Sequence, residues 1–419
     1  MINLTKQAGF DLARRHRAEQ RFQWAGRLAI LTSLAFLVFM TGSILIDAAG
    51  VVRRTQIAVA VDLKSGLVDP ADITSASFGA ILKSGLRAQF PEVSTRRQKK
   101  KLYNLVSPEG SFEIKRQVRD DPALLGGVQT LWLTASDDLD LYLRGKIDTS
   151  LPENRRRISN AEVTWIEELQ QAGQIRRVLN WGFLTGGDSR EPEIAGILSA
   201  LIGSLFSLAV CFSLSFPIGI GAAIYLEEFA PKNRISDLIE VNINNLAAVP
   251  SIVFGLLGLS IFLGYMGLLR SSPLVGGMVL ALMTLPTIII AARASLRSVP
   301  PSFKEAALAL GATPVQAVFH HVLPVAMPGM LTGAIIGMAQ ALGETAPLLM
   351  IGMVAFIVDL PQSILEPATA LPVQIFLWAD SPERAFTEKT AAAIIVLLIF
   401  LIAMNLIAIL LRRKLEQRF

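Results

Sequence analysis

Long uncharged stretches of apolar residues dominate the chain and alternate with short charged segments. The first stretch, Leu28–Ile46, contains 19 residues without a charged side chain. At about 1.5 Å per residue, a helix of this length crosses the roughly 30 Å hydrocarbon core of a bilayer. Further apolar blocks follow at Ile194–Tyr225, Leu246–Leu269, Leu274–Ala292, Gly329–Ile351 and Ala391–Leu411. The pattern predicts an all-α polytopic membrane protein with about six transmembrane helices.

Residues 47–193, between the first and second predicted spans, have a different pattern. They are rich in Arg, Lys, Asp and Glu and contain no apolar run of span length. Gln56–Leu63 and Thr130–Thr134 predict strands. Asn160–Gln171 predicts a helix whose apolar residues share one face: Val163, Ile166 and Leu169. Because roughly 140 residues can bury a core of their own, we expect a mixed α/β domain inserted here.

One basic run in this insert has two interpretations. It consists of Arg96, Arg97, Lys99, Lys100 and Lys101. A patch that attracts an anionic surface is one interpretation, and a solvated loop is the other. The solvated loop is the commoner outcome for such a run, so we favour it.

Composition supports the membrane assignment and excludes several kinds of chemistry. Only 17% of the residues are charged, whereas an ordinary soluble domain is nearer a quarter. The single cysteine, Cys211, excludes an intramolecular disulfide, and with only three histidines no zinc-type cluster is available. No glycine-rich nucleotide loop and no catalytic triad order is present. We therefore expect no cofactor and no enzyme activity, so any work that the chain does must be driven by a partner.

The basic residues predict how the chain is oriented in the membrane. The net charge is +5, but Lys and Arg cluster beside the apolar blocks, which indicates topology control and not binding of nucleic acid. The basic segments 1–27 and 412–419 are expected in the cytoplasm, with the first span at 28–46 and residues 47–193 outside. A cleaved signal peptide is the alternative for the first span, and its length disfavours that reading.

A charged loop before the fifth predicted span, residues 298–327, carries the strongest motif. It contains Glu305-Ala306-Ala307, then Gly311 after three residues, then His321-Val322-Leu323-Pro324. The residues predict one helix from Ser302, a break at Gly311, and a second short helix from Pro314 that ends at Pro324. Periodicity alone leaves two interpretations, a knob that fits a groove on another protein or an amphipathic connector.

The spacing of this loop resembles the segment with which bacterial ABC importer permeases dock on their ATPase subunit. Other stretches resemble the PstA-type phosphate permeases in particular, and the resemblance covers Asn180–Leu411. These stretches are Tyr225–Pro231, Asn245–Leu256, Leu285–Ile289 and Gly343–Leu349. The chain departs from the family pattern at His321, where an aliphatic residue is usual, and at Gln340, where many phosphate permeases carry a basic residue.

The resemblance implies a function, a set of partners and a docking site. It implies an ABC importer permease fold with five spans and the loop within residues 194–411, in the bacterial inner membrane with both termini cytoplasmic. The partners would be a second, PstC-type permease, a PstB-type ATPase dimer and a periplasmic PstS-type phosphate-binding protein, with phosphate as the substrate. The insert resembles the extra N-terminal domain of some proteobacterial PstA proteins. The ATPase-docking residues would be Glu305, Ala306, Ala307, Gly311, Leu323 and Pro324.

Glu344 is the candidate residue of the translocation path, together with Thr345 and Arg293. A carboxylate inside a membrane span costs several kcal/mol unless it is paired, so a functional role is the default. We expect Glu344 to pair with Arg293 or with a basic residue of a partner subunit and to gate the path. The alternatives are a protonated Glu344 that only packs the spans together, and an Arg293 that snorkels to the membrane surface.

Two rival functions remain open. One is the same machine for another oxyanion, such as sulfate, molybdate or phosphonate. The other is a membrane-anchored sensor whose external domain binds a ligand. A sensor does not need five further spans with an intramembrane carboxylate, so the sequence favours transport.

Overall fold

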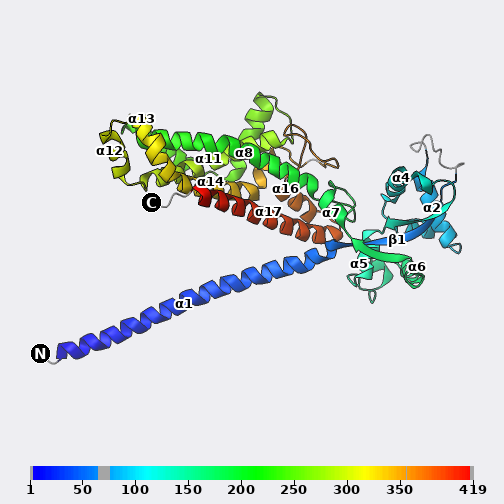
Figure 1. The fold of residues 1–419 in the computed structure, drawn as a ribbon. Coiled ribbons are helices and arrows are strands. Elements are labelled where there is room, and N and C mark those ends of the chain that lie inside the picture. The colour runs from blue at the N-terminus through cyan, green and yellow to red at the C-terminus, as the bar shows by residue number, and fades with distance from the viewer. Residues whose placement is uncertain (1–2, 65–75, 355, 416–419) are drawn as a thin grey trace.

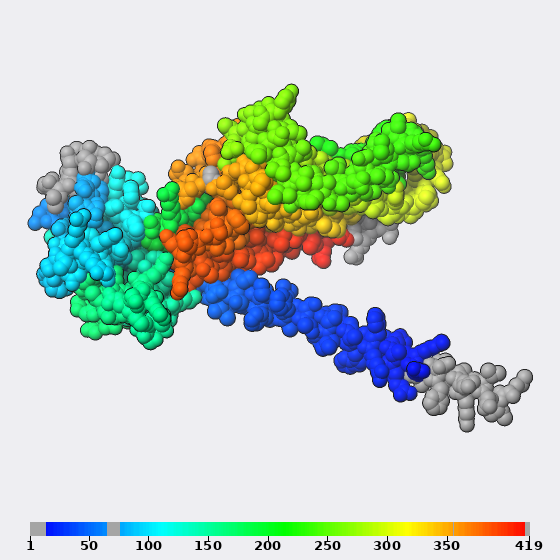
Figure 2. Space-filling model, turned by 180° about the vertical axis from the view of Figure 1, so that it is seen from behind, coloured from blue at the N-terminus to red at the C-terminus, as the bar shows by residue number. Residues whose placement is uncertain are grey.

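The computed structural model describes residues 3–64, 76–354 and 356–415. Figure 1 shows a helical bundle with a smaller α/β domain, the insert, at one end. We call this end of the bundle the insert end and the opposite end, where α12 lies, the loop end. The long helix α1 (Asn3–Ala48) ends at the junction with the insert, and its N-terminal part diverges from the bundle, as the space-filling view in Figure 2 also shows.

In the described part of the chain, five helices are long and apolar enough to cross a membrane. They lie on α1, on α8 (Leu198–Ile224), on α11 (Pro273–Arg297), on the helix that ends as α14 (Leu323–Gly343) and on α17 (Ala385–Leu415). A sixth span results if α9 (Arg234–Ala247) and the segment Ser251–Tyr265 count as one crossing bent by 100°. The expected multi-pass helical architecture is therefore confirmed.

Helix α11 is the centre of the bundle. In its most apolar window 61% of the residues are buried, against 0% for α1 and α17. The backbones of α8 and α11 approach closely because a glycine faces the contact: a Cβ atom added at Gly277 would lie 2.6 Å from the carbonyl oxygen of Ser207. Gly333 of α14 meets Ala291 of α11 in the same way. Small residues at such contacts are typical of helices that pack inside a membrane.

Two predicted spans are broken by proline. The block Leu246–Leu269 is not one helix, because Pro250 interrupts it before α10 (Ser251–Gly258) and the π-helical η5 (Leu259–Tyr265). The block Gly329–Ile351 ends at Gly343 and resumes as α15 (Ala346–Met350). The ring of Pro347 would clash with the carbonyl of Gly343 if the helix continued, since those residues are four apart.

The structure differs from the predicted helices at two further places, Pro324 and the segment before the last span. Pro324 does not terminate the second loop helix, which runs unbroken through the π-helical turn η6 (Val318–Val322) into α14. The wider backbone of that turn accommodates the proline ring, which would otherwise meet the carbonyl of His320. Between the predicted spans Gly329–Ile351 and Ala391–Leu411, where no helix was predicted, the structure also contains the largely buried helix α16 (Leu371–Ala379), which is too short to have been recognised as a span.

The insert is built on a three-stranded antiparallel sheet of order β2-β1-β3. Its strands are β1 (Arg53–Asp62), β2 (Val128–Thr134) and β3 (Ile175–Leu179). Strand β2 includes the predicted Thr130–Thr134, and β1 covers all of the predicted Gln56–Leu63 except Leu63. Strand β3 was missed because its sequence, IRRVL, is short and carries two arginines. The register places Ile57 opposite Leu133 and Val59 opposite Leu131.

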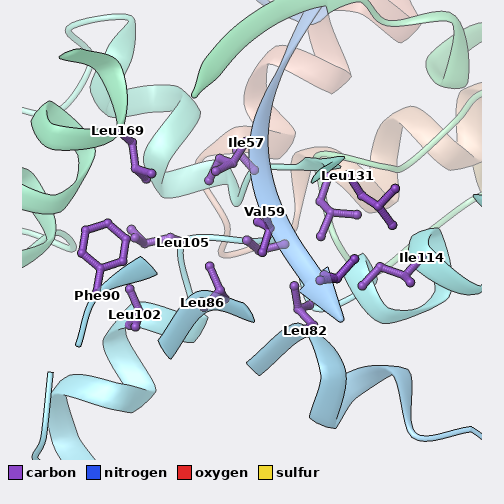
Figure 3. Packing of buried hydrophobic residues seen from close by; sticks show 14 of the residues in the cluster. Ile57, Val59, Leu82, Leu86, Phe90, Leu102, Leu105, Ile114, Leu131 and Leu169 are labelled. Carbon is purple, nitrogen blue, oxygen red and sulfur yellow. The ribbon is translucent and has the colours of Figure 1, made fainter. Parts of the chain in front are cut away.

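Helices cover this sheet and complete the core of the insert. Figure 3 shows Leu82, Leu86 and Ile114 converging on Val59 of β1. The helices are α2 (Phe78–Gln89), α3 (Arg96–Tyr103), α4 (Gly110–Asp120), α5 (Asp137–Leu143) and α6 (Asn160–Gln171). The bounds of α6 are those predicted. The basic run forms α3, capped by the Thr95 side chain, and is therefore not the loop we expected.

Replacing Leu133 by alanine tests the packing of the insert. Leu133 is fully buried in β2, so we expect Leu133→Ala to destabilise the insert by about 2–5 kcal/mol. Val128 in the same strand is 62% exposed, and Val128→Ala is the matched control with an expected effect within about 0.5 kcal/mol. The measurement is the rate of proteolysis of the full chain in rising urea; equal sensitivity of both variants would contradict the described core.

Candidate functional site

The predicted docking loop forms a short helical pair at the loop end of the bundle (Figure 1). Helix α12 (Pro301–Ala309) begins with proline at its first position, one residue before the predicted start at Ser302. Gly311 has φ +91°, a left-handed conformation that favours glycine and turns the chain. Thr313 and Gln316 then form a capping box that opens α13 (Pro314–Ala317).

The side chains of this loop leave an apolar surface in solvent. Glu305 and Ala306 are exposed, while Ala307 packs inward at 5% exposure. The tip residue Leu310 is 90% exposed. The other exposed apolar residues of the loop are Leu308, Val315 and Phe319. Sequence reasoning missed these side chains, although such an exposed apolar cluster is typical of a protein contact.

An ionic network ties the docking loop to the bundle. Arg293 of α11 binds Glu227 at 3.3 Å and Glu240 of α9 at 2.9 Å. Arg297 binds Glu227 at 2.8 Å, and Lys304 of α12 reaches Glu228 at 2.5 Å. Both glutamates at 227 and 228 lie in the π-helical turn η4 (Tyr225–Phe229) that ends α8. Since Arg293 is only 12% exposed, it is an internal member of this network and not a snorkelling cation.

The structure does not bring Glu344 and Arg293 together. Glu344 is the extended residue that ends α14, and its half-buried carboxylate has no hydrogen bond or ion pair within the described residues. Helices α11 and α14 are antiparallel, with Gly329 against Ser295. Glu344 is therefore about 20 Å along α14 from the level of Arg293. The expected pairing is wrong because both residues lie near the C-terminal ends of their helices, and antiparallel packing holds those ends apart. Thr345 follows at the same break.

The last two docking candidates lie where the loop becomes a span. Leu323 and Pro324 are half-buried at the start of α14, and the helix from Pro314 to Gly343 is continuous. This helix therefore links the docking loop at one end to Glu344 at the other.

At the insert end, buried ion pairs join the insert to the last helix. Glu388 of α17 binds Arg144 at 2.5 Å and Lys146 at 2.7 Å, and Arg144 also binds Asp140 of α5 at 2.5 Å. Lys389 donates a hydrogen bond to the carbonyl of Ala195 at 2.8 Å. Glu388 is 7% and Arg144 12% exposed, so this contact fixes the insert firmly to α17. The only sequence signal was two adjacent charges at the edge of an apolar block.

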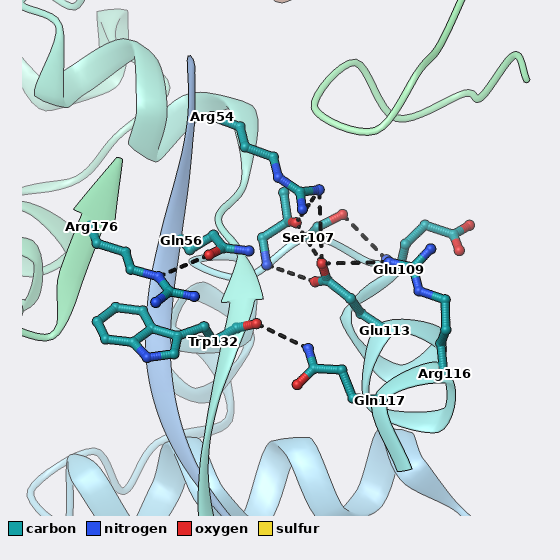
Figure 4. A network of polar contacts seen from close by, with 10 residues as sticks. Arg54, Gln56, Ser107, Glu109, Glu113, Arg116, Gln117, Trp132 and Arg176 are labelled. Atoms are coloured by element: carbon teal, nitrogen blue, oxygen red, sulfur yellow. Dashed lines mark hydrogen bonds and ion pairs between the residues drawn. The ribbon is translucent and has the colours of Figure 1, made fainter. Parts of the chain in front are cut away.

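A second polar network holds α4 on the sheet of the insert (Figure 4). Glu113 is buried and accepts hydrogen bonds from the backbone N–H and the hydroxyl of Thr134, at 2.7 and 2.9 Å. Arg176 donates to Gln56 at 3.0 Å and lies over the Trp132 ring at 4.1 Å. Because Glu113 and Arg176 both have hydrogen-bond partners within the insert, this network stabilises the fold and is not arranged as a reactive site.

Two family models match the chain. Residues 215–419 match the family described as "Binding-protein-dependent transport system inner membrane component". Residues 10–153, which cover most of α1 and much of the insert, match a domain of unknown function, DUF3333. The two matches thus correspond to the bundle and to the additional N-terminal part.

Relatives and one solved structure are each similar to about half of the chain. The phosphate transport system permease protein PstA 1 of Mycobacterium tuberculosis is 32% identical over 232 residues, or 55% of this chain and 75% of the relative. PstA of Haemophilus influenzae is 31% identical over 214 residues, or 51% of this chain and 74% of that protein. A chain of the inward-facing MetNI methionine ABC transporter shares 19% identity over 52% of this chain and 96% of its own, with a TM-score of 0.42.

The chain belongs to the family of binding-protein-dependent inner membrane components, the permease subunits of ABC transporters. Within that family, the resemblance to PstA-type phosphate permeases with an extra N-terminal domain is confirmed. Such permeases act together with ATPase and substrate-binding proteins, and the permease subunit is not itself the enzyme.

Glu193, beside the junction, predicts a pH dependence of stability. Burial raises the pKa of Glu193 to about 7, and this effect outweighs the Ser107 hydroxyl beside the carboxylate, which lowers the pKa. Asp137 and Glu191 act in the same direction as burial, and Lys389 lines the same small cavity. Since the pKa is raised on folding, the contribution of Glu193 to stability is greatest below about pH 4.5 and falls by up to about 3 kcal/mol as the pH rises from about 4.5 to 7.

The measurement is the melting temperature of the full chain in detergent between pH 5 and 8. Glu193→Gln should be more stable than the native chain at pH 8 and should lose most of this pH dependence. The control Glu92→Gln alters an exposed carboxylate of the insert and should leave the pH profile unchanged. A native stability that rises from pH 5 to 8 would show that Glu193 ionises freely when folded.

Proposed function

We propose that the chain is the transmembrane permease subunit of an ATP-driven importer for inorganic phosphate. The single observation that supports this most is the helical pair at the loop end, with Leu310 exposed at its tip and ion pairs anchoring its base. Leu310 is one of four exposed apolar side chains on this short loop, with Leu308, Val315 and Phe319, and a group of this kind is typical of a protein contact. The motifs shared with PstA-type relatives support phosphate as the substrate.

The proposed topology places both termini and the docking loop, residues 298–327, in the cytoplasm, and the insert outside the inner membrane. The first span is 28–46, and residues 194–411 form the permease core. A PstB-type ATPase dimer would grip the loop around Glu305, Ala306, Ala307 and Gly311. A PstC-type second permease and a PstS-type binding protein would complete the importer.

The continuous helix from Pro314 to Gly343 suggests how ATP drives transport. Movement of the docking loop would carry Leu323 and Pro324 with it, because no break separates them from α13. The same helix would then displace Glu344 and Thr345, which follow its last residue. Alternating access follows if that displacement opens the outer side as the inner side closes.

Glu344 is proposed to act on the path through a partner. A carboxylate repels phosphate, and Glu344 has no cation beside it in the described part of this chain. We propose that it pairs with a basic side chain of the second permease. Arg293 is already bound to Glu227 and Glu240 and would instead hold the docking loop in position.

Uptake of radiolabelled phosphate by cells that lack this chain tests the function. We expect the native chain to restore uptake and Glu305→Lys to lower it at least about tenfold, the effect of losing roughly 1.4 kcal/mol of contact energy. Glu92→Lys, a charge reversal on the insert far from the loop, is the matched control and should restore uptake fully. Unchanged phosphate uptake without the chain, in cells with no second phosphate importer, would refute the substrate. Loss of sulfate uptake instead would reassign it.

Labelling of introduced cysteines tests the topology. The one native cysteine, Cys211, is fully buried and will not compete for a maleimide. We expect Ser94→Cys on the insert to react with a membrane-impermeant maleimide in intact spheroplasts. Ala309→Cys on α12 should react only after the membrane is permeabilised, and the opposite pattern would invert the topology.

A further inference from the structure

A cleft of about 310 Å³ lies where the insert meets the two outermost spans. One side is Asp47 at the end of α1, and another is Arg384, Thr387 and Glu388 at the start of α17. The remaining wall comes from the segment of the insert between Asp138 and Arg157. Because two apolar spans end here and a polar domain begins, the cleft lies at the level of the lipid headgroups.

The cleft contains more positive charge than its own carboxylates neutralise. Glu388 is bound to Arg144 and Lys146, Asp138 is bound to Arg157 at 3.5 Å, and Asp148 accepts hydrogen bonds from Ser150. The basic residues that line it are Lys146, Arg155, Arg156, Arg157 and Arg384, and the acidic ones are Asp47, Asp138, Asp148 and Glu388.

Three of the guanidinium groups remain without a carboxylate partner among the described side chains. Arg155 and Arg384 are exposed at the mouth of the cleft. Arg156 donates to the carbonyl of Thr149 at 3.3 Å and to Asn160, and its Nε is buried with no acceptor. A buried donor that lacks an acceptor within the described residues can take one from outside the chain.

Apolar surface continues from the cleft into the membrane. Ile46, next to Asp47, is 77% exposed, and Leu151 on the rim is 41% exposed. The apolar windows of α1 and α17 are both 0% buried, so hydrocarbon chains can lie against them. A ligand that spans this boundary must carry an anionic oxygen group at one end and apolar chains at the other.

We propose that this cleft binds the phosphodiester headgroup of an anionic phospholipid. Arginine suits this role, since its planar fork donates two parallel hydrogen bonds to phosphate oxygens. Arg155 belongs to the insert and Arg384 directly precedes α17, so one headgroup would join the insert to this helix. The bound lipid would anchor the insert to the membrane surface beside the buried Glu388–Arg144 pair. Inorganic phosphate shares the anionic chemistry but gains nothing from the adjoining apolar surface.

Native mass spectrometry of the full chain in detergent, with added phosphatidylglycerol or phosphatidylcholine, tests the proposal. We expect phosphatidylglycerol to be retained preferentially. Each arginine near a membrane surface changes affinity for an anionic lipid about fivefold, so Arg155→Ala/Arg384→Ala should weaken retention by roughly 25-fold. Arg96→Ala/Arg97→Ala removes the same charge from exposed α3 and should retain the lipid as the native chain does.

Three results would overturn the assignment. They are equal retention of both lipids, unchanged retention by the alanine double variant, and displacement of the lipid by millimolar inorganic phosphate alone. Arg155→Lys/Arg384→Lys keeps both charges and should retain most of the preference for phosphatidylglycerol. Melting temperatures without lipid separate loss of the site from loss of the fold, and the lysine variant carries the test if the alanine variant unfolds.

Discussion

Inside a bilayer every backbone N–H and C=O group must find its partner within the protein, and this constraint arranges the rest of the molecule. It makes each crossing a helix and makes charge within the spans costly, with Glu344 as the unpaired exception. The charged groups therefore gather at the two ends: Arg293 with Glu227 and Glu240 at the loop end, and Glu388 with Arg144 at the insert end. Breaks occur where proline removes a donor, as at Pro250 and Pro347.

The same constraint makes the bundle suitable for carrying motion. A continuous helix can carry a displacement along its length. The helix from Pro314 to Gly343 runs without a break from the docking loop to Glu344. The two ends of the bundle differ in their surfaces. The loop end presents exposed apolar side chains around Leu310, whereas the insert end is closed by buried ion pairs. The loop end would thus suit the partner proposed for it, whereas the insert end is a buried attachment within the chain.

Much of this architecture could be predicted from the sequence, because spans depend on length and hydropathy alone. The apolar blocks, the two longer strands and α6 were found in this way. Features that depend on neighbours in space were not. The predicted Glu344–Arg293 pairing is wrong because the sequence does not show that α11 and α14 are antiparallel, which keeps these two residues apart. Pro324 was misread because a π-helical turn absorbs it, and Leu310 was missed because its exposure is set by the tertiary fold.

The central claim is that this chain converts ATP hydrolysis by a separate subunit into passage of phosphate. Proteoliposomes containing the chain with a second permease, an ATPase dimer and a phosphate-binding protein test it most directly, with labelled phosphate supplied on the side of the binding protein. The account predicts uptake that requires ATP on the opposite side and is lost when this chain is omitted. Uptake that persists without this chain, or ATP-dependent uptake of sulfate but not of phosphate, would contradict it.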